Sequence, residues 1–342
     1  MTEAMDTFVV TGERAGLELD EYLCLQYPGL PKGFVRREIS AGHVLVDGVE
    51  CAPNKRLRTN QVVMATIDWE NAPDRPVDPG VDIPVLHEDD QVLVVDKPAG
   101  LAVEPERWLK GLGSLAGALL QMVEERAAGA DAEELPFRPR LVHRIDKDTT
   151  GAVLVAKSLE AERALRTAFE AGTVGKRYLA LVEGDLGLGP DGSMTLDDPI
   201  GPARSGRMRI AADGKPSRTD VEVAESFDGY TLARCSPRTG RTHQIRVHMA
   251  HAGFPLVVDP LYGRRDALRL SEFKSGYRAK RGMPEKPLID RLTLHAHEVD
   301  VPPLPGSDRD AALTVTAPVP RDFERVLKQM RKVRPPRTRR FG

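Results

Sequence analysis

A proline-rich stretch near residue 70 most constrains how this chain can fold. Between Glu70 and Pro84, four prolines alternate with aspartate and glycine, and no hydrophobic periodicity remains. Proline removes a backbone donor and fixes φ, so helices and central strands rarely continue through such a stretch. A chain of 342 residues is also long enough for two domains. We therefore predict an N-terminal domain over residues 1–69, a linker over 70–84 and a larger domain over 85–330.

Composition excludes several classes of protein. A hydrophobic content of 41% with 29% charged residues is typical of a chain that buries an ordinary core. No apolar stretch approaches the roughly 20 residues that a membrane span needs, and the N-terminus lacks a basic region followed by an apolar one. The three cysteines are scattered and form no Cys-x-x-Cys pair, which argues against a disulfide framework and against a zinc site. We expect a cytoplasmic protein with no membrane contact.

The net charge of -2 gives no global sign of a nucleic-acid partner, so any such sign must be local. Residues 321–342 contain nine Lys and Arg against Asp322 and Glu324. A run of this kind is compatible with a solvated surface and with phosphate contact. We interpret residues 331–342 as a basic C-terminal tail and leave its role open.

The N-terminal segment combines helical and hairpin patterns. Apolar residues from Leu17 to Leu23 indicate a helix, a basic helix follows over residues 34–39, and the Asp47-Gly48 pair predicts a tight hairpin. Residues 12–66 resemble the S4 RNA-binding module, although Glu18 and Gly33 depart from its usual residues. The resemblance implies that Arg36 and Arg37 face RNA phosphates. A small α/β interaction domain without RNA contact is the alternative.

After the linker, strand and helix patterns mix without a regular βαβ rhythm. The expected elements are strands over 85–87, 91–95, 152–156 and 178–182 and helices over 114–127 and 159–171. Ser114 is placed to cap the first of these helices. We predict an α+β fold with a mixed, largely antiparallel central sheet and flanking helices. No Gly-x-Gly-x-x-Gly follows a strand and no Walker motif occurs, so no nucleotide cofactor is expected.

Two polar segments are candidates for chemistry. Residues 143–151, His-Arg-Ile-Asp-Lys-Asp-Thr-Thr-Gly, place an acid among basic and hydroxyl groups before a buried strand, although a polar turn is an equally ordinary interpretation. In the second segment, residues 239–253, Thr242 is placed to cap a helix that buries Ile245, Met249 and Ala252. Arg246 would project from the neighbouring face of that helix.

Four motifs in a fixed order make the resemblance specific. Residues 143–151, the Lys-Arg-Tyr strand from Lys176, the Thr-Gly-Arg-Thr-His-Gln-Ile-Arg run from Thr239, and Asp259-Pro-Leu-Tyr-Gly resemble the RluA-like RNA pseudouridine synthases. The resemblance covers about residues 85–327. It implies that Asp146 is a nucleophile, that Arg246 is its ion-pair partner and that Tyr178 stacks on the target base, with no cofactor and no metal.

The residue types suit the reaction that this resemblance implies. Moving uracil from an N1 to a C5 linkage requires the glycosidic bond to break while the base is held, and a carboxylate can stabilise or trap the ribose. Arg144 resembles the family residue that fills the space left by the flipped uridine. Lys97, Lys176, Lys215 and Arg241 are candidate phosphate contacts, and each is also compatible with ordinary surface.

Other functions stay open at this point. His248 and His251 lie at i, i+3 and, with Asp146 or Asp259, are compatible with a metal-dependent hydrolase. A non-catalytic RNA-binding or ribosome-assembly protein is a second alternative. We expect structured RNA as the partner, with large-subunit ribosomal RNA ahead of transfer RNA, and a monomer without an obligate protein partner.

Overall fold

The chain forms two compact units. The computed structural model describes residues 5–73, 75, 77–105, 113–129, 137–188, 192–203, 206–278, 283–307 and 309–335. The first unit comprises Met1–Asp82, Glu104–Leu141 and Ala156–Glu160, and the second comprises Ile83–Val103, Val142–Val155 and Ala161–Gly342. The domain limits given above for the sequence remain predictions. None of the helices in the described part is long and apolar enough to span a membrane.

The first unit begins with a four-stranded sheet in the order β1-β4-β2-β3 and two helices. Its elements are β1 (Asp6–Val9), α1 (Leu19–Gln26), α2 (Lys32–Ser40), β2 (Val44–Val46), β3 (Val49–Glu50) and β4 (Val62–Ala65), with a 3-10 turn at Gly12–Arg14. The predicted hairpin is confirmed: Asp47 and Gly48 link β2 to β3 with φ values of 53° and 80°. A two-residue hairpin turn of type I′ requires a positive φ at both of its central residues.

The first unit also contains α3 (Leu115–Gly129) and β7 (Arg140–Leu141). Ser114 caps α3 as predicted, because its hydroxyl accepts a hydrogen bond from the backbone N–H of Gly117 at 3.2 Å. The proline-rich stretch packs on the start of this helix: the N–H of Ser114 donates to the carbonyl of Val77. A Cβ on Gly117 would lie 2.0 Å from that same carbonyl oxygen, so only glycine permits this approach.

Replacing Ser114 with alanine is expected to make the amides of the first turns of α3 exchange about fivefold faster, which corresponds to about 1 kcal/mol of lost capping energy. The buried N–H of Gly117 would then have no side-chain acceptor. Hydrogen–deuterium exchange with mass spectrometry measures this. Ser275→Ala, at an exposed loop serine, is the matched control. Equal exchange in both variants would contradict the capping role.

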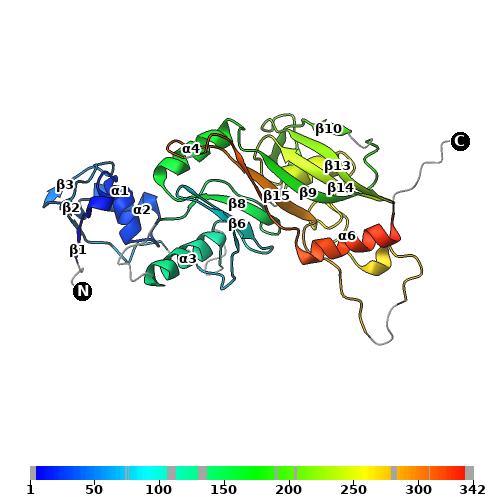
Figure 1. Cartoon of the computed structure of the whole chain (residues 1–342), viewed down its shortest axis with the longest axis horizontal. Coiled ribbons are helices and arrows are strands. Elements are labelled where there is room, and N and C mark those ends of the chain that lie inside the picture. The colour runs from blue at the N-terminus through cyan, green and yellow to red at the C-terminus, as the bar shows by residue number, and fades with distance from the viewer. Residues whose placement is uncertain are drawn as a thin grey trace. The chain divides into compact units, whose positions relative to one another are not determined.

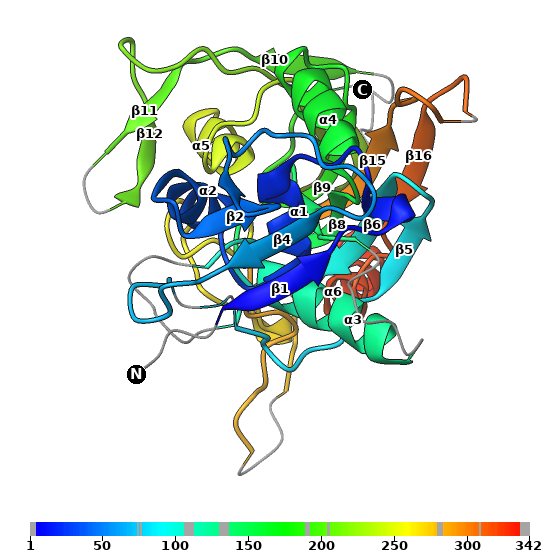
Figure 2. The same cartoon turned by 90° about the vertical axis from the view of Figure 1, so that its left-hand side faces the viewer.

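The second unit contains the large sheet, in the order β10-β13-β14-β9-β15-β8-β6-β5 (Figure 1), with β16 beside β15 as labelled in Figure 2. Its strands are β5 (Val85–Glu88), β6 (Val92–Lys97), β8 (Thr150–Ala156), β9 (Lys176–Glu183), β10 (Ser193–Leu196), β13 (Thr219–Phe227), β14 (Tyr230–Pro237), β15 (Leu294–Val301) and β16 (Leu313–Thr316). β8 and β15 run parallel, whereas β9 pairs antiparallel with both β14 and β15. The predicted α+β class with a mixed, largely antiparallel sheet is confirmed.

Three helices and a separate hairpin accompany the large sheet. The helices are α4 (Leu159–Glu170), α5 (Gln244–His251) and α6 (Arg321–Val333), and a 3-10 turn spans Leu270–Glu272. The hairpin pairs β11 (Ile200–Pro202) with β12 (Met208–Ile210). β12 contacts α5, and Figure 2 shows the hairpin beside this helix. Because α6 runs to Val333, the predicted basic tail begins inside a helix, and Arg337, Arg339 and Arg340 lie outside the described residues.

The two faces of the large sheet have different roles. On β9, Leu179 and Leu181 belong to the core that contains Phe323 and Leu327 of α6. Tyr178 points to the opposite face, because side chains alternate along a strand. Tyr178 pairs with Ala296 of β15 and with Cys235 of β14, and partners in register share a face. The face of Tyr178 therefore lies opposite α6.

Gly151 allows a close approach between two strands of this sheet. It pairs with Ala296 in the parallel β8–β15 ladder, and a Cβ on Gly151 would lie 2.1 Å from the carbonyl oxygen of Ala296. Its φ of 113° is also one that other residues rarely adopt. The glycine that ends the first candidate motif thus fixes how the preceding loop meets the sheet.

Candidate active site

A cavity of about 510 Å³ opens on the Tyr178 face of the second unit. This volume lies in the usual range for a small-molecule site. Its wall includes five cationic side chains, Arg144, Lys176, Arg238, Arg241 and Arg246, together with Asp146, Glu170, Tyr178 and His243. The two candidate motifs therefore line one cavity, and its positive wall favours an anionic ligand.

Asp146 and Arg246 form the ion pair that the resemblance implies. Asp146 lies in the loop before β8 and Arg246 on α5, and Arg246 Nη1 donates to Asp146 Oδ2 at 3.0 Å. The side chain of Arg246 is only 6% exposed, whereas that of Asp146 is 20% exposed and so remains open to the cavity. The guanidinium stabilises the carboxylate charge by a charge-assisted hydrogen bond.

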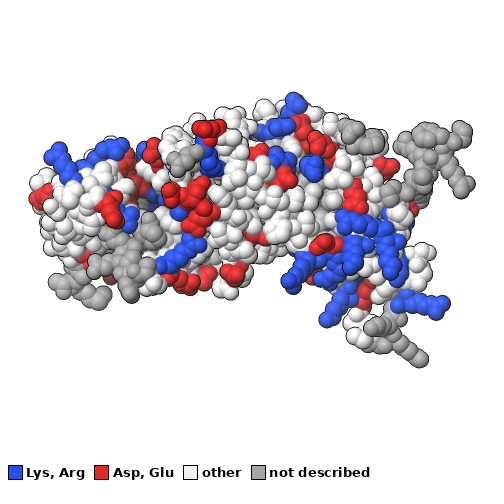
Figure 3. Space-filling view, in the orientation of Figure 1, with Lys and Arg blue, Asp and Glu red and all other residues white. Residues whose placement is uncertain are grey.

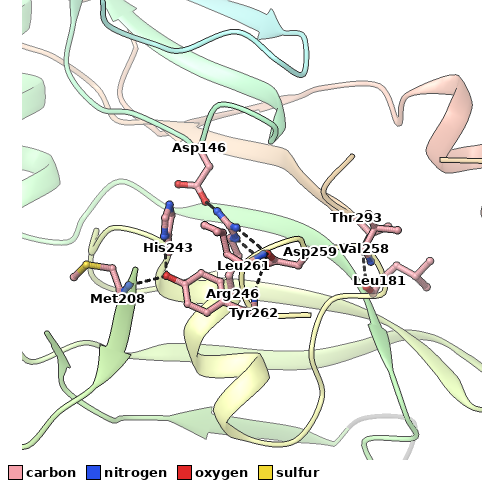
Figure 4. Close-up of polar contacts among 10 residues, drawn as sticks. All are labelled: Asp146, Leu181, Met208, His243, Arg246, Val258, Asp259, Leu261, Tyr262 and Thr293. Carbon is pink, nitrogen blue, oxygen red and sulfur yellow. Dashed lines mark hydrogen bonds and ion pairs between the residues drawn. The ribbon is translucent and has the colours of Figure 1, made fainter. Parts of the chain in front are cut away.

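Asp259 fixes the orientation of Arg246, a role that the sequence analysis did not assign. Its two carboxylate oxygens accept from Nε and Nη2 of Arg246, each at 2.8 Å, and the Asp259 side chain is fully buried. Burial alone would lower the pKa of Arg246, but the hydrogen bonds and charge of Asp259, with Asp146, raise it above its ordinary value. Because Asp259 occupies the edge of the guanidinium formed by Nε and Nη2, Nη1 is the nitrogen that donates to Asp146 (Figure 4).

The loop that carries Asp259 is itself held in place. Asp259 Oδ1 accepts from the backbone N–H groups of Leu261 and Tyr262 at 2.9 and 3.1 Å. The hydroxyl of Thr293 bridges the N–H of Val258 and the carbonyl of Leu181 on β9. The carboxylate is thus anchored to the sheet through several hydrogen bonds, which fits a positioning role.

Tyr178 lies on β9, lines the same cavity as Asp146 and is 9% exposed. Burial, and then the charge of Asp146, raise the pKa of its phenol above the ordinary value of 10. At neutral pH the ring is therefore a neutral phenol that presents an apolar surface to the cavity. This environment suits stacking on a base better than proton abstraction.

His243 and Tyr262 are two further side chains at the site that sequence reasoning missed. His243 Nδ1 lies 2.8 Å from the hydroxyl of Tyr262, and that hydroxyl accepts from the N–H of Met208 on β12. Figure 4 shows His243 and Arg246 both pointing toward Asp146. The Arg246 guanidinium lies 5.1 Å from the centre of the Tyr262 ring, a cation–π distance. His243 lies in the motif that begins at Thr239, and Tyr262 lies in the motif that begins at Asp259. Membership of these motifs is the sequence feature that could have indicated a place at the site.

The predicted start of α5 was wrong by one residue. The helix begins at Gln244, and His243 precedes it with a left-handed φ of 56°, so Thr242 caps nothing. Gln244 takes over the local contacts: its Oε1 accepts from Thr239 Oγ1 at 2.6 Å and from the N–H of Arg241 at 3.1 Å. The predicted burial of Ile245 and Met249 is confirmed, whereas Ala252 is only partly buried.

Only some of the residues predicted to contact phosphates line the cavity. Arg144, Lys176 and Arg241 line the cavity, and burial lowers the pKa of Lys176. Lys215 is exposed and lies outside the cavity wall. Arg36 and Arg37 are exposed on α2 of the first unit; Arg36 is 3.4 Å from Asp20, and Arg37 lies over the ring of Phe34. Their phosphate contacts remain predictions.

The prediction that Lys97 contacts a phosphate on the surface has to be corrected. Its side chain is fully buried, and its Nζ donates to the carbonyls of Pro98, Leu101 and Lys147 at 2.7–2.8 Å. Burial lowers its pKa to about 7, and the charges of Asp148 and Asp146 oppose that shift. A phosphate cannot reach this group, so Lys97 instead ties the loop of Asp146 to the end of β6.

The histidines considered for a metal are engaged otherwise. His248 is buried, with Nδ1 2.9 Å from Thr219 Oγ1 and Nε2 3.0 Å from the carbonyl of Asp198. His251 is exposed. Across the described residues, no group of three or more His, Cys, Asp or Glu side chains is arranged to hold a metal ion.

Comparison with known proteins agrees with this geometry. Residues 91–251 match the family model for RNA pseudouridylate synthase. The chain is 35% identical over 328 residues to the ribosomal large subunit pseudouridine synthase D of Xanthomonas campestris, with 95% of this chain and 92% of the relative covered. It is 32% identical over 346 residues to the ribosomal large subunit pseudouridine synthase C of Escherichia coli, with 97% and 99% covered.

A solved structure supports the fold. Human RNA Pseudouridylate Synthase Domain Containing 4 superposes with a TM-score of 0.52 at 23% identity, covering 72% of this chain and 92% of that one. Identity this low shows the fold alone, whereas the longer matches carry the family. On these matches, the chain belongs to the RluA-like RNA pseudouridine synthases and is an isomerase.

Proposed function

We propose that this enzyme converts specific uridines of large-subunit ribosomal RNA to pseudouridine, with Asp146 as the nucleophile. The observation that carries the proposal is the cavity in which Asp146 meets Arg246 at 3.0 Å beside the ring of Tyr178. The RNA class follows from the relatives, which are named as ribosomal large subunit pseudouridine synthases. We further propose that the enzyme acts in the cytoplasm as a monomer.

In the proposed reaction, the carboxylate of Asp146 stabilises or traps C1′ of the ribose while the bond from C1′ to N1 of uracil breaks. The released uracil then turns so that C5 bonds to C1′, and where Asp146 has trapped C1′ the bond between the carboxylate and C1′ breaks in this step. C5 loses its proton and N1 gains one, so the product is an isomer of the substrate and no co-reactant is consumed. Arg246 donates a hydrogen bond that holds the Asp146 carboxylate in place, and Asp259 keeps Arg246 directed at it.

The target uridine must leave its stack to enter the cavity, which costs roughly a few kcal/mol. Two groups are placed to offset this cost. Tyr178 offers a ring face inside the cavity, and Arg144, exposed at its wall, can occupy the space that the uridine leaves. Lys176 and Arg241 are the proposed contacts to the neighbouring phosphates.

Residues 1–69, within the first unit, are proposed to bind RNA as an S4-like domain. Arg36 and Arg37 share the exposed side of α2, whereas Phe34 and Ile39 are buried on the other side. Such phosphate contacts position an enzyme on RNA without reading its sequence.

The proposal is tested by mapping pseudouridine in total RNA through carbodiimide-dependent stops of reverse transcription. Wild-type cells are compared with a deletion strain and with a strain carrying Asp146→Ala. We expect discrete stops in large-subunit ribosomal RNA that are absent from both mutants. Stops that vanish only from transfer RNA would overturn the substrate assignment, and stops that persist in the Asp146→Ala strain would overturn the nucleophile.

A further inference from the structure

Helix α6 has two opposite faces of different character. Its buried face packs into the core beneath the large sheet through Phe323, Val326, Leu327 and Met330. The opposite side carries four exposed cations at i, i+4, i+7 and i+11, within an arc of roughly 60° at 3.6 residues per turn. These four residues, here called the α6 stripe, are Arg321, Arg325, Lys328 and Lys332. Figure 3 shows Lys and Arg gathered over this helix.

The stripe differs from the other charged groups of this helix. Off the stripe, Arg331 pairs with Glu225 and Asp322 pairs with Arg291, each at 2.7 Å, and these pairs fasten α6 to the sheet and to the segment before β15. No member of the stripe makes an ion pair or a side-chain hydrogen bond with another described residue. Its charges therefore remain available to an outside partner.

In the free protein this arrangement is unfavourable. Like charges three and four residues apart on a helix repel, and Arg321 adds a cation at the positive N-terminal end of the helix dipole. Glu324, also exposed on this helix, offsets only one of the four charges. Removing these cations would relieve the repulsion without disturbing the buried face. An anionic partner that bridges all four positions, over about 16 Å of helix, offsets the repulsion.

The position of the stripe limits what that partner can be. The stripe faces away from the core formed with Leu179 and Leu181, whereas the cavity lies on the Tyr178 face of the same strand. A ligand that fills only the cavity cannot reach α6, because the sheet separates them. The described residues of α6 expose no large hydrophobic side chain, which removes the apolar contact that a membrane-binding helix needs.

We propose that the α6 stripe binds the phosphate backbone of a second segment of the substrate RNA, so that the RNA extends from the cavity around the edge of the sheet. The inference rests on the proposed function and refines its substrate class: the preferred substrate is an extended structured RNA and not an isolated stem-loop. Cations in a row contact successive phosphates without reading bases, so the stripe contributes affinity and not sequence choice.

The test compares two RNAs that contain the same target uridine, a short stem-loop and a complete domain of large-subunit ribosomal RNA. The full-length variant Arg321→Gln/Arg325→Gln/Lys328→Gln/Lys332→Gln removes the stripe. Arg321→Lys/Arg325→Lys/Lys328→Arg/Lys332→Arg keeps the charge and serves as the matched control. kcat/KM is measured on both RNAs, and filter binding of the domain is measured from 50 to 200 mM salt.

The glutamine variant is expected to lose at least about tenfold in kcat/KM on the domain and less than about twofold on the stem-loop, while the charge-keeping variant matches the wild type. The slope of log Kd against log salt should become shallower by roughly three, as expected for four lost phosphate contacts. Equal losses on both RNAs, or no loss on the domain, would overturn the proposal. If wild-type enzyme isomerises neither RNA, the substrate assignment fails, and the binding slope still decides whether the stripe contacts RNA.

Discussion

Replacing Asp146 with asparagine is expected to lower the single-turnover rate of pseudouridine formation by about 10³-fold or more. The amide has nearly the shape of the carboxylate and can still accept from Arg246 Nη1, but it has no negative charge with which to stabilise or trap C1′. The affinity for RNA should change by less than about threefold, because the cavity keeps its cationic wall. Release of tritium from RNA labelled at C5 of uridine measures the rate, and filter binding measures the affinity.

Asp148→Asn is the matched control. Asp148 lies two residues along the same loop and is exposed, and it is not part of the cavity wall. This variant removes one negative charge from the same loop, so it should retain the wild-type rate within about threefold. A rate for Asp146→Asn within tenfold of the wild type would show that the carboxylate is not the nucleophile.

Replacing Asp259 with alanine is expected to lower both the stability and the activity of the enzyme. Arg246 would keep one carboxylate partner instead of two while staying buried, and breaking a buried ion pair from one side costs about 3–5 kcal/mol. The backbone N–H groups of Leu261 and Tyr262 would lose their acceptor as well. Urea unfolding followed by circular dichroism measures the stability, and tritium release measures the activity.

A double variant separates the two roles of this pair. Arg246→Met with Asp259→Leu replaces the buried charges by apolar groups, and such exchanges are often neutral or stabilising. We expect the double variant to recover most of the urea midpoint lost by Asp259→Ala and to remain inactive, because nothing then directs a cation at Asp146. Recovery of activity together with stability would show that Arg246 acts only as a structural residue.

The central residues of the site could be predicted from the sequence because they lie in short motifs. Asp146, Tyr178 and Arg246 come from three segments, and the structure brings all three to one cavity. The contact of Asp259 with Arg246 could not be predicted from the sequence, although Asp259 belongs to one of the four motifs. A carboxylate next to proline and leucine gives no local sign that an arginine 13 residues earlier will share its burial.

The errors have local physical causes. Thr242 has a side chain typical of a helix cap. However, the side chain of Gln244 accepts the hydrogen bonds from the preceding loop, and α5 begins at Gln244. Lys97 looked like a surface cation, because only the fold reveals that three carbonyls surround its ammonium group. Burial is a property of the whole structure, and a single charged residue next to a proline does not encode it.

The fold was predictable at the level of class and of individual strands. Apolar runs located β6, β8 and β9 within a few residues, and the Asp-Gly pair located the β2–β3 hairpin. The order of strands in the large sheet was not predictable. It depends on pairings such as β9 with β14 and β15, whose partners are far apart in the chain and share no local pattern.

The parallel pairing of β8 with β15 also sets the order in which the enzyme can assemble during synthesis. Thr150 and His295 are 145 residues apart, and Gly151 meets Ala296 in the same ladder. The strand that follows Asp146 therefore lacks one of its neighbours until the ribosome has released the chain through β15. Contacts over such separations form slowly, whereas all the strands of the small sheet lie within the first 70 residues of the chain. A nascent chain stalled before residue 294 would thus display a folded N-terminal sheet while β8, which follows the loop of Asp146, still lacks its neighbour β15.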